Sequence, residues 1–598
     1  MESPKAGIPA PSGHGVFRVV ANHPVRWAIA LVASIYVTTL FFLPADGMWT
    51  VDNSEKYLQV QALVSSGLRS TALNWAGRTL VPETQCNPIP PPLGVIVDGK
   101  LHAIYSVPFV LFSSLPFKVA GIRGLVFLPV VATLLMLLGV ARLAGSLGLG
   151  RGMQAWAVLA AGLATPLWFY SVMVWEHGLA ACLLIWAVIA AVEHARSGAI
   201  QPLVLSACLA AACIFFRDDL CMFPPLLLAA LLWLRKPSWP EVLRTITIFA
   251  VTAAVAVAPL GIINHVYTGN PLGLHLGSHP SEQFEYPGGL LGYLESRPPV
   301  FHLLLSALHT RLPVALVLAF PILLLFVWLP RVSLCRQRWV APLVAGWAAV
   351  PLLLGLWGLS QGRNPIAQLI GTNSLFYSAP FIVLGLLRPD SKDGGEKDRQ
   401  GITSMLARVV LAVAVLYGLI TPQVTAVRGI HWGNRFLLHS YPILAVLAVA
   451  TIARLHRDAR ARAGVGLLIP VLAIALSASG QAYSVSLALR MERFFSRLNH
   501  SVEAMNPKAV LTDAWWVPTQ LYRVFPSRPV FLVSDQTCWA SLEPRLKQAG
   551  ITEVLEVRWN RGLEALTPGT KRITDEGLDY FGVDLRPATP STFKWRVR

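Results

Sequence analysis

Long apolar windows separated by short polar segments dominate the pattern along the chain. Thirteen windows have roughly the length, about 17–25 residues, at which a helix crosses a bilayer and satisfies its own backbone hydrogen bonds. They predict membrane spans at about 27–44, 124–141, 153–171, 178–195, 200–216, 220–234, 245–266, 312–330, 339–357, 373–387, 404–421, 438–453 and 464–481.

The composition agrees with this pattern. Of 598 residues, 54% are hydrophobic and 13% are charged, against a charged fraction of about 25% in soluble proteins. This excludes an ordinary soluble protein. The sequence predicts an all-α polytopic membrane protein.

The positions of the basic residues predict the orientation. The formal net charge is +18, and basic residues crowd the short segments on one side of the predicted spans. On the other side, the short loops hold only Arg217, Arg363, Arg428 and Arg435. By the positive-inside rule the N-terminus is cytoplasmic. The basic balance is then a topology signal, so no nucleic-acid partner is expected.

Three outside parts remain once the spans are placed. The first loop, 45–122, contains an apolar stretch at 101–118 that we interpret as an interfacial or re-entrant helix, since counting it as a span would invert every later loop. The second is the loop 267–311. The third is the C-terminal part, where hydropathy falls and soluble patterning begins.

Short strands and helices alternate in that C-terminal part. Strands are predicted at 510–512, 529–534 and 551–557, and helical stretches at 519–524 and 540–549. They indicate a small extracytoplasmic α/β domain that we expect to support or recognise a partner rather than perform chemistry. The expected organisation is a cytoplasmic tail at 1–26, a transmembrane domain at 27–481 and this domain at 482–598.

The cysteines and the first span carry two further expectations. Most cysteines lie in or beside predicted spans and are most simply small packing residues. Cys86 and Cys538 are the two far enough outside the bilayer to form a disulfide in an oxidising compartment. No small-residue cleavage pattern follows the first span, so we expect an uncleaved anchor.

Candidate chemistry begins just after the first span. Asp52 and Glu55 lie three residues apart, followed by Lys56, in a stretch whose apolar positions favour a helix. In the functional interpretation these groups belong to a site on the outer face. In the structural alternative, Asp52 and Asn53 only cap the helix and Glu55 stays solvated.

Other polar groups gather at the same membrane face. Each has a structural alternative: Glu176 and His177 as a satisfied loop pair, Arg217 in a local salt bridge with Asp218 and Asp219, and the late arginines as snorkelling residues. Their shared side favours function, because independent structural charges would have no reason to lie together. The complete candidate set is Asp52, Glu55, Lys56, Tyr105, Glu176, His177, Arg217, Arg428, Trp432 and Arg435.

This placement suits the transfer of a sugar from a lipid-linked phosphate to a hydroxyl. The acceptor hydroxyl needs a general base, for which Asp52 with Glu55 is the candidate. The departing phosphate needs cations, and Arg435, Arg428 and Arg217 have the planar fork that binds phosphate oxygens. The remaining candidates, Lys56, Tyr105, Glu176, His177 and Trp432, are expected to bind substrate.

At these residues the chain resembles the GT-C superfamily of membrane glycosyltransferases, particularly the branch with protein O-mannosyltransferases and the lipid A aminoarabinose transferase. The resemblance covers about 25–450. It rests on four motifs in order: the acidic motif 52–57, Tyr-Ser-x-Pro at 105–108, Trp-Glu-His at 175–177 and Trp-Gly-Asn-Arg at 432–435. The adjacent Asp-Glu pair of the superfamily is here Asp52-x-x-Glu55, and its His-Pro-Pro-x-Gly segment is absent, although Pro90-Pro91-Pro92-Leu93-Gly94 lies nearby.

The resemblance implies an inverting hexosyl or pentosyl transfer from a polyprenyl-phosphate sugar to a glycan, lipid or protein acceptor. Asp52 matches the first-loop acid, and Arg435 matches the late arginine that faces the donor phosphate. It also implies the bacterial inner membrane, with the C-terminus periplasmic or extracellular. No Asp-x-Asp motif is present in the first loop, so no metal site is predicted and a divalent ion is left open.

Two other functions compete with this one. A transporter or flippase of a lipid-linked glycan would place polar sites near the bilayer midplane, often in paired repeats. Charges within the predicted spans are almost absent and no internal repeat is evident. A noncatalytic receptor or scaffold that uses the C-terminal domain is the third hypothesis.

Overall fold

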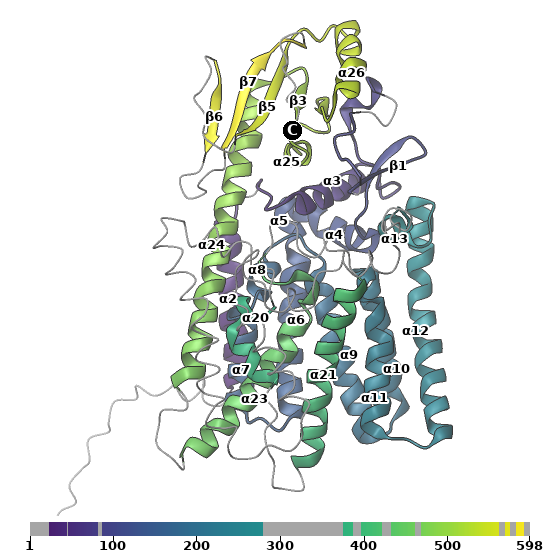
Figure 1. Cartoon of the computed structure of the whole chain (residues 1–598), viewed down its shortest axis with the longest axis vertical. Coiled ribbons are helices and arrows are strands. Elements are labelled where there is room, and N and C mark those ends of the chain that lie inside the picture. The colour runs from purple at the N-terminus through teal and green to yellow at the C-terminus, as the bar shows by residue number, and fades with distance from the viewer. Residues whose placement is uncertain are drawn as a thin grey trace, which may run out of the picture.

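The computed structural model describes residues 23–44, 46–81, 86–91, 93–278, 375–386, 396–420, 432–460, 468–560, 569–574 and 582–590. Within these ranges the chain forms a bundle of long helices, a layer of short helices above one end of it, and a small sheet beyond that layer (Figure 1).

Five of the described helices are long and apolar enough to cross a membrane. They lie at or within the elements α2 (Pro24–Phe42), α5 (Ile122–Leu125) with α6 (Phe127–Ser146), α9 (His177–Ser197), α12 (Trp239–Thr268) and α24 (Leu468–Met505). Their outward faces carry exposed Phe41, Leu135, Val255 and similar side chains, as expected for contact with lipid.

Other predicted spans also form helices. These are α7 (Arg151–Leu163), α10 (Ile200–Ala212) with η2 (Cys213–Phe215), α11 (Phe223–Arg235), α21 (Glu396–Ile420) and α23 (Ser440–Arg460). The predicted spans at 312–330 and 339–357 lie outside the described residues. The count of thirteen therefore stays a prediction.

Two predicted spans do not form single helices. The window 153–171 is divided between α7 and α8 (Leu167–Ser171), because Pro166 lacks the N–H that would continue the helix and restricts the residue before it. The window 373–387 contains α20 (Leu375–Ser378) and the 3₁₀ helix η4 (Pro380–Leu386), separated at Pro380. Proline thus breaks an apolar run that hydropathy alone predicts as continuous.

The first outer loop forms two short helices and a hairpin. Helix α3 (Val51–Ser65) and helix α4 (Val107–Ala120) lie between the bundle and the sheet (Figure 1). They are joined through η1 (Ala76–Thr79) and the antiparallel strands β1 (Gly94–Val97) and β2 (Lys100–Ala103). The stretch 101–118 is thus part strand and part helix, and its 14-residue helix is too short to span a bilayer.

The C-terminal domain is a mixed sheet of five strands in the order β4-β3-β5-β7-β6. Strand β3 (Val510–Thr512) pairs in parallel with β4 (Val530–Leu532) and β5 (Val554–Asn560). Strand β7 (Gly582–Ala588) pairs antiparallel with β5 and β6 (Lys571–Thr574). The helices α25 (Val517–Gln520) and α26 (Gln536–Gln548) complete the domain. The α/β prediction is confirmed, although β6, β7 and the β1–β2 hairpin were not predicted.

Three contacts hold this domain to the first loop. Cys86 and Cys538 form the disulfide for which they were the candidates, across 452 residues of sequence. The Trp75 indole donates a hydrogen bond of 2.9 Å to the carbonyl of Val530. Tyr57 of α3 packs edge-on against Tyr522, with ring centroids 4.8 Å apart. Helix α24 passes without a break from the bundle to the sheet, so the expected boundary at 481 falls inside one helix (Figure 1).

Candidate active site

An ion pair between an early and a late residue of the chain marks the site. Nη1 of Arg435 donates a hydrogen bond of 2.6 Å to Oδ2 of Asp52, across 383 residues of sequence. The Arg435 guanidinium also lies over the ring of Trp175, 5.5 Å from its centroid. Asp52 keeps 21% of its side-chain surface exposed and Arg435 keeps 15%. Both charges can therefore be reached by a substrate.

The start of α3 explains why Asp52 is free to form this pair. Thr50 is the N-cap, and it forms a capping box with Asn53, whose Oδ1 accepts from the Thr50 N–H at 3.2 Å. The Asn53 amide in turn donates 2.9 Å to the carbonyl of Val174. The capping alternative is thus correct for Asn53 alone, while the Asp52 carboxylate is left to meet Arg435.

Glu55 and Lys56, one turn further along α3, are buried. Glu55 is 0% exposed, so it is not the solvated residue of the structural alternative. Lys56 is 1% exposed, and its Nζ lies 2.7 Å from Oε2 of Glu176 and 4.4 Å from the ring centroid of Tyr105. These two side chains therefore belong to the interior of the site.

Glu176 links Lys56 to a second arginine. Its Oε1 lies 3.5 Å from Nη1 of Arg217, and this same nitrogen donates a hydrogen bond of 2.7 Å to Nε2 of His177. Because an arginine can only donate, Nε2 of His177 accepts, and its ring proton is placed on Nδ1, 3.6 Å from the Glu176 carboxylate. Nε and Nη2 of Arg217 also donate hydrogen bonds to the two carboxylate oxygens of Asp219. The predicted local salt bridge of Arg217 is present, and it is part of a larger network.

The charges of this network shift the pKa values of the two carboxyls of α3 in opposite directions. Burial opposes ionisation of Asp52, but the charges of Arg435 and Lys56 outweigh it and lower the pKa of Asp52 to about 2. Burial, together with the negative charge of Asp52, holds the pKa of Glu55 well above its usual range. Asp52 therefore ionises much more readily than Glu55, and a carboxyl must be ionised to act as a base.

The Trp-Gly-Asn-Arg motif is built to present Arg435. The Trp432 indole donates 2.8 Å to Oε1 of Gln481 on α24. Gly433 has a φ of 63°, and a Cβ there would meet Pro166, Tyr441 and Ser378 within 3 Å. Asn434 caps the 3₁₀ helix η5 (Arg435–Leu437) by accepting from the N–H of Leu437. Trp432 thus anchors the loop to α24, whereas the sequence had suggested that it binds substrate.

The Tyr-Ser-x-Pro motif places Tyr105 against α3. Ser106 caps α4 by accepting from the Phe109 N–H at 3.3 Å, and its hydroxyl donates to the carbonyl of Phe215. This second bond ties the first loop to the segment that carries Arg217. Burial and the neighbouring negative charge of Asp52 raise the pKa of Tyr105 well above its usual range, so its hydroxyl stays protonated.

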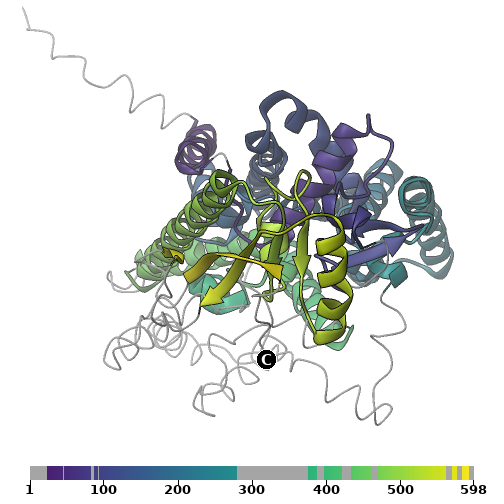
Figure 2. The same cartoon turned by 90° about the horizontal axis from the view of Figure 1, so that it is seen from above.

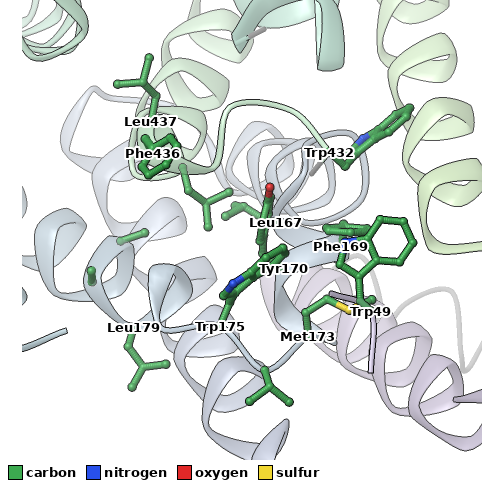
Figure 3. Close-up of a cluster of buried hydrophobic side chains, with 14 of the residues drawn as sticks. Trp49, Leu167, Phe169, Tyr170, Met173, Trp175, Leu179, Trp432, Phe436 and Leu437 are labelled. Carbon is green, nitrogen blue, oxygen red and sulfur yellow. The ribbon is translucent and has the colours of Figure 1, made fainter. Parts of the chain in front are cut away.

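Aromatic side chains form the wall behind these charges. Figure 3 shows Trp49, Phe169, Tyr170, Trp175 and Phe436 gathered from four segments of the chain. Both arginines lie over Phe436, with the guanidinium carbons of Arg217 and Arg435 at 5.2 and 4.9 Å from its ring centroid. Phe436 was not a candidate, because it begins an apolar run; its position directly after Arg435 is the signal that was available.

Of the ten candidates, Arg428 lies outside the described residues. The structure brings together Asp52, Glu55, Lys56, Tyr105, Glu176, His177, Arg217 and Arg435, and Trp432 holds the loop that carries the last of these. Among the described residues, no three His, Cys, Asp or Glu side chains converge as a metal site. A divalent ion therefore remains open.

No family model matches the chain, and no curated protein matches it significantly. Solved structures do. The archaeal oligosaccharyltransferase AglB from Archaeoglobus fulgidus, in complex with an inhibitory peptide and a dolichol-phosphate, is 11% identical with a TM-score of 0.48, over 90% of this chain and 70% of that one. ArnT from Cupriavidus metallidurans bound to undecaprenyl phosphate is 14% identical with a TM-score of 0.42, over 93% and 97%. The apo state of ArnT is 15% identical with a TM-score of 0.43.

Proposed function

We propose that this protein is an inverting glycosyltransferase that moves a sugar from a polyprenyl-phosphate donor to a hydroxyl acceptor at the outer membrane face. The observation that carries the proposal is the accessible ion pair of Asp52 and Arg435. It joins a base and a phosphate-binding cation in one site at the end of the bundle that faces the sheet. The acceptor is a glycan, a lipid or a protein.

The donor phosphate would bind to Arg435 and Arg217. Their guanidinium groups lie over the same Phe436 ring, and their side chains keep 15% and 14% of their surface exposed. A planar guanidinium offers two parallel donors to a phosphate and keeps its charge in a partly apolar site. Arg428, from the segment before this loop, is proposed as a third phosphate-binding residue.

Donor binding would also activate the base. While Asp52 is paired with Arg435, its pKa of about 2 makes it a weak proton acceptor. A phosphate that binds Arg435 competes for the same guanidinium protons, which weakens the ion pair and raises the pKa of Asp52. The base would therefore become effective only when donor is present.

The transfer step then follows in one displacement. The acceptor oxygen attacks the anomeric carbon from the face opposite the phosphate, and the bond from that carbon to the phosphate oxygen breaks. Asp52 takes the acceptor proton, and polyprenyl phosphate leaves with the bonding electron pair on its oxygen. Attack from the opposite face inverts the anomeric carbon.

The buried groups would support this step without exchanging protons with substrate. Glu55, protonated next to Asp52, and Lys56, paired with Glu176, hold α3 in position. His177 and Glu176 hold Arg217. We assign Glu55 a supporting role, since a carboxyl that keeps its proton cannot serve as the base.

Asp52→Asn tests the proposal. In proteoliposomes supplied with polyprenyl-phosphate sugars and acceptor membranes, this variant should release polyprenyl phosphate about 10²–10⁴ times more slowly, the usual contribution of a general base. Asp98→Asn is the matched control, because Asp98 is exposed in the β1–β2 turn. Wild-type transfer by Asp52→Asn would remove Asp52 as the base. Movement of labelled donor across the vesicle without a new glycosidic bond would support the flippase.

A further inference from the structure

A cavity lies at the upper end of the bundle, next to the start of α3. It has a volume of about 210 Å³ and lies between the outer ends of α2, α5, α6 and α24. Its lining is mainly apolar and includes Val37, Phe41, Met48 and Val126. Figure 2 shows α2 beside α24 in the view from above, as Figure 1 does from the side.

A separate groove with a mainly apolar lining lies further along α2 and α24. It is lined on α2 by Ile35 and Phe42 and on α24 by Val485 and Leu489, with Trp168 behind them. Leu489 lies about one turn before Glu492, which lines the cavity. Because Val37 and Phe41 are exposed on helix α2, a hydrocarbon chain in the bilayer can reach both spaces without crossing polar protein.

Glu492 is the unusual member of the lining. Its side chain is only 6% exposed, yet within the described ranges it makes no ion pair and no hydrogen bond. The nearby donors are engaged: the Tyr522 hydroxyl bonds the carbonyl of Asp46, and the Asn53 amide bonds that of Val174. Arg123 lines the exposed mouth of the cavity. A buried carboxyl without a partner is costly, so it indicates a missing ligand group.

We propose that this cavity binds one hydrocarbon chain of a membrane amphiphile whose headgroup carries a hydroxyl, and that the hydroxyl hydrogen-bonds Glu492. An apolar lining requires the chain, and the carboxyl requires the polar group. A hydroxyl both donates and accepts, so it satisfies Glu492 in either protonation state. A phosphate headgroup does not fit, because it offers mainly acceptor oxygens and negative charge to a carboxyl.

The cavity is separate from the proposed catalytic site. Asn53 and Val174, which share a hydrogen bond, both line the cavity, whereas Asp52, Trp175 and Arg435 do not. The amphiphile is therefore a ligand in addition to donor and acceptor. Its binding should not require Asp52.

Photolabelling of the full chain in nanodiscs tests the proposal. The probes are a long-chain alcohol carrying a diazirine on its chain, the phosphate ester of that alcohol and the corresponding alkane. Peptide mass spectrometry should place the alcohol adducts on residues 37–48 and 122–126. Val37→Trp fills the cavity and should reduce these adducts several-fold. Val255→Trp, at an exposed position of α12, is the matched control and should leave them unchanged.

The headgroup assignment has its own variants. Glu492→Leu should reduce capture of the alcohol by about two- to tenfold, the effect of one lost hydrogen bond, and should leave capture of the alkane unchanged. Glu492→Gln, which keeps a donor and an acceptor, should retain the alcohol. Asp52→Asn should label like the wild type, so that a failure of the proposed transfer reaction is distinguishable from a failure here. Equal labelling by the phosphate ester, or adducts that Val37→Trp does not reduce, would overturn the proposal.

Discussion

Arg435 and Asp52 meet at 2.6 Å although 383 residues separate them in sequence. Arg435 comes from a 3₁₀ turn before α23 and Asp52 from the first turn of α3, so the pair joins an early and a late segment of the chain at one end of the bundle. A contact of this kind links the assembly of the bundle to the assembly of the proposed catalytic centre.

Arg435→Ala should weaken donor use more than acceptor use. Loss of a charge-assisted hydrogen bond to the donor phosphate costs about 1.5–3 kcal/mol, or roughly ten- to a hundredfold in apparent donor affinity. Initial rates with donor and acceptor varied in turn measure the two effects. Arg69→Ala, an exposed arginine on the same membrane face, should change neither. An equal rise of both Michaelis constants would contradict a phosphate-binding role.

The buried pair of Lys56 and Glu176 should show strong coupling. Lys56→Met leaves the buried Glu176 carboxylate with only its longer contact to Arg217, so it should lower the free energy of unfolding by up to about 3–5 kcal/mol, the effect of an unpaired buried charge. Adding Glu176→Gln to Lys56→Met should recover part of this loss. Thermal unfolding of the two single variants and the double variant in detergent gives the coupling energy. Purely additive effects would mean that the pair does not interact.

Reduction of the Cys86–Cys538 disulfide should loosen the sheet from the first loop. Disulfides typically stabilise the folded state by about 2–4 kcal/mol, so Cys86→Ser should lower the thermal midpoint and speed proteolysis of 510–560. Cys208→Ser removes a free thiol in α10 and should leave both unchanged. A reduced wild type that resists protease like the oxidised form would contradict this prediction.

The attachment of α13 (Gly273–Ser278) should depend on pH. His275 Nδ1 lies 2.7 Å from Oδ2 of Asp218; burial lowers the pKa of His275, but the Asp218 charge outweighs this and raises it overall. The pKa of Asp218 is lowered in turn: burial raises it, and the charge and hydrogen bond of His275 lower it more. Because the folded pKa of His275 exceeds the unfolded value of about 6.5, the ion pair stabilises fully below that value and is lost as pH rises through the folded pKa.

Hydrogen exchange across 273–278 measures this dependence. Protection of these backbone amides should be high near pH 6 and should fall towards pH 9. His275→Gln should remove the pH dependence, since Gln does not titrate. A His275→Gln protein that keeps the same profile would show that another titrating group controls it.

The sequence predicted which residues matter better than it predicted how they are held. Hydropathy and the side of each loop placed Asp52 and Arg217 on one membrane face. A shared site for Asp52 and Arg435 was predicted, but their direct ion pair was not, because it depends on Gly433, whose positive φ turns the chain between Trp432 and Arg435. The raised pKa of Glu55 was equally out of reach, since it follows from complete burial beside a second carboxyl.

The fold, too, was predicted only in part. Strands rich in Val, Leu and Phe were predicted within a few residues, because β-branched and apolar runs bounded by turns are a local signal. The divided span at 153–171 was missed, since Pro166 stands alone in an apolar window and hydropathy does not register a missing N–H. The hairpin β1–β2 was missed because its four-residue strands carry little alternation.

Helix α24 is a long, continuous connection between the bundle and the sheet. Its 38 residues extend about 57 Å without interruption, at 1.5 Å per residue, and a straight helix resists bending. Gln481, partway along this helix, accepts a hydrogen bond from the Trp432 indole and donates one to the carbonyl of Ser378. A molecule that binds the sheet and tilts it would therefore also tilt the part of α24 that lies in the bundle. This would displace Gln481, to which the loop that presents Arg435 is hydrogen-bonded.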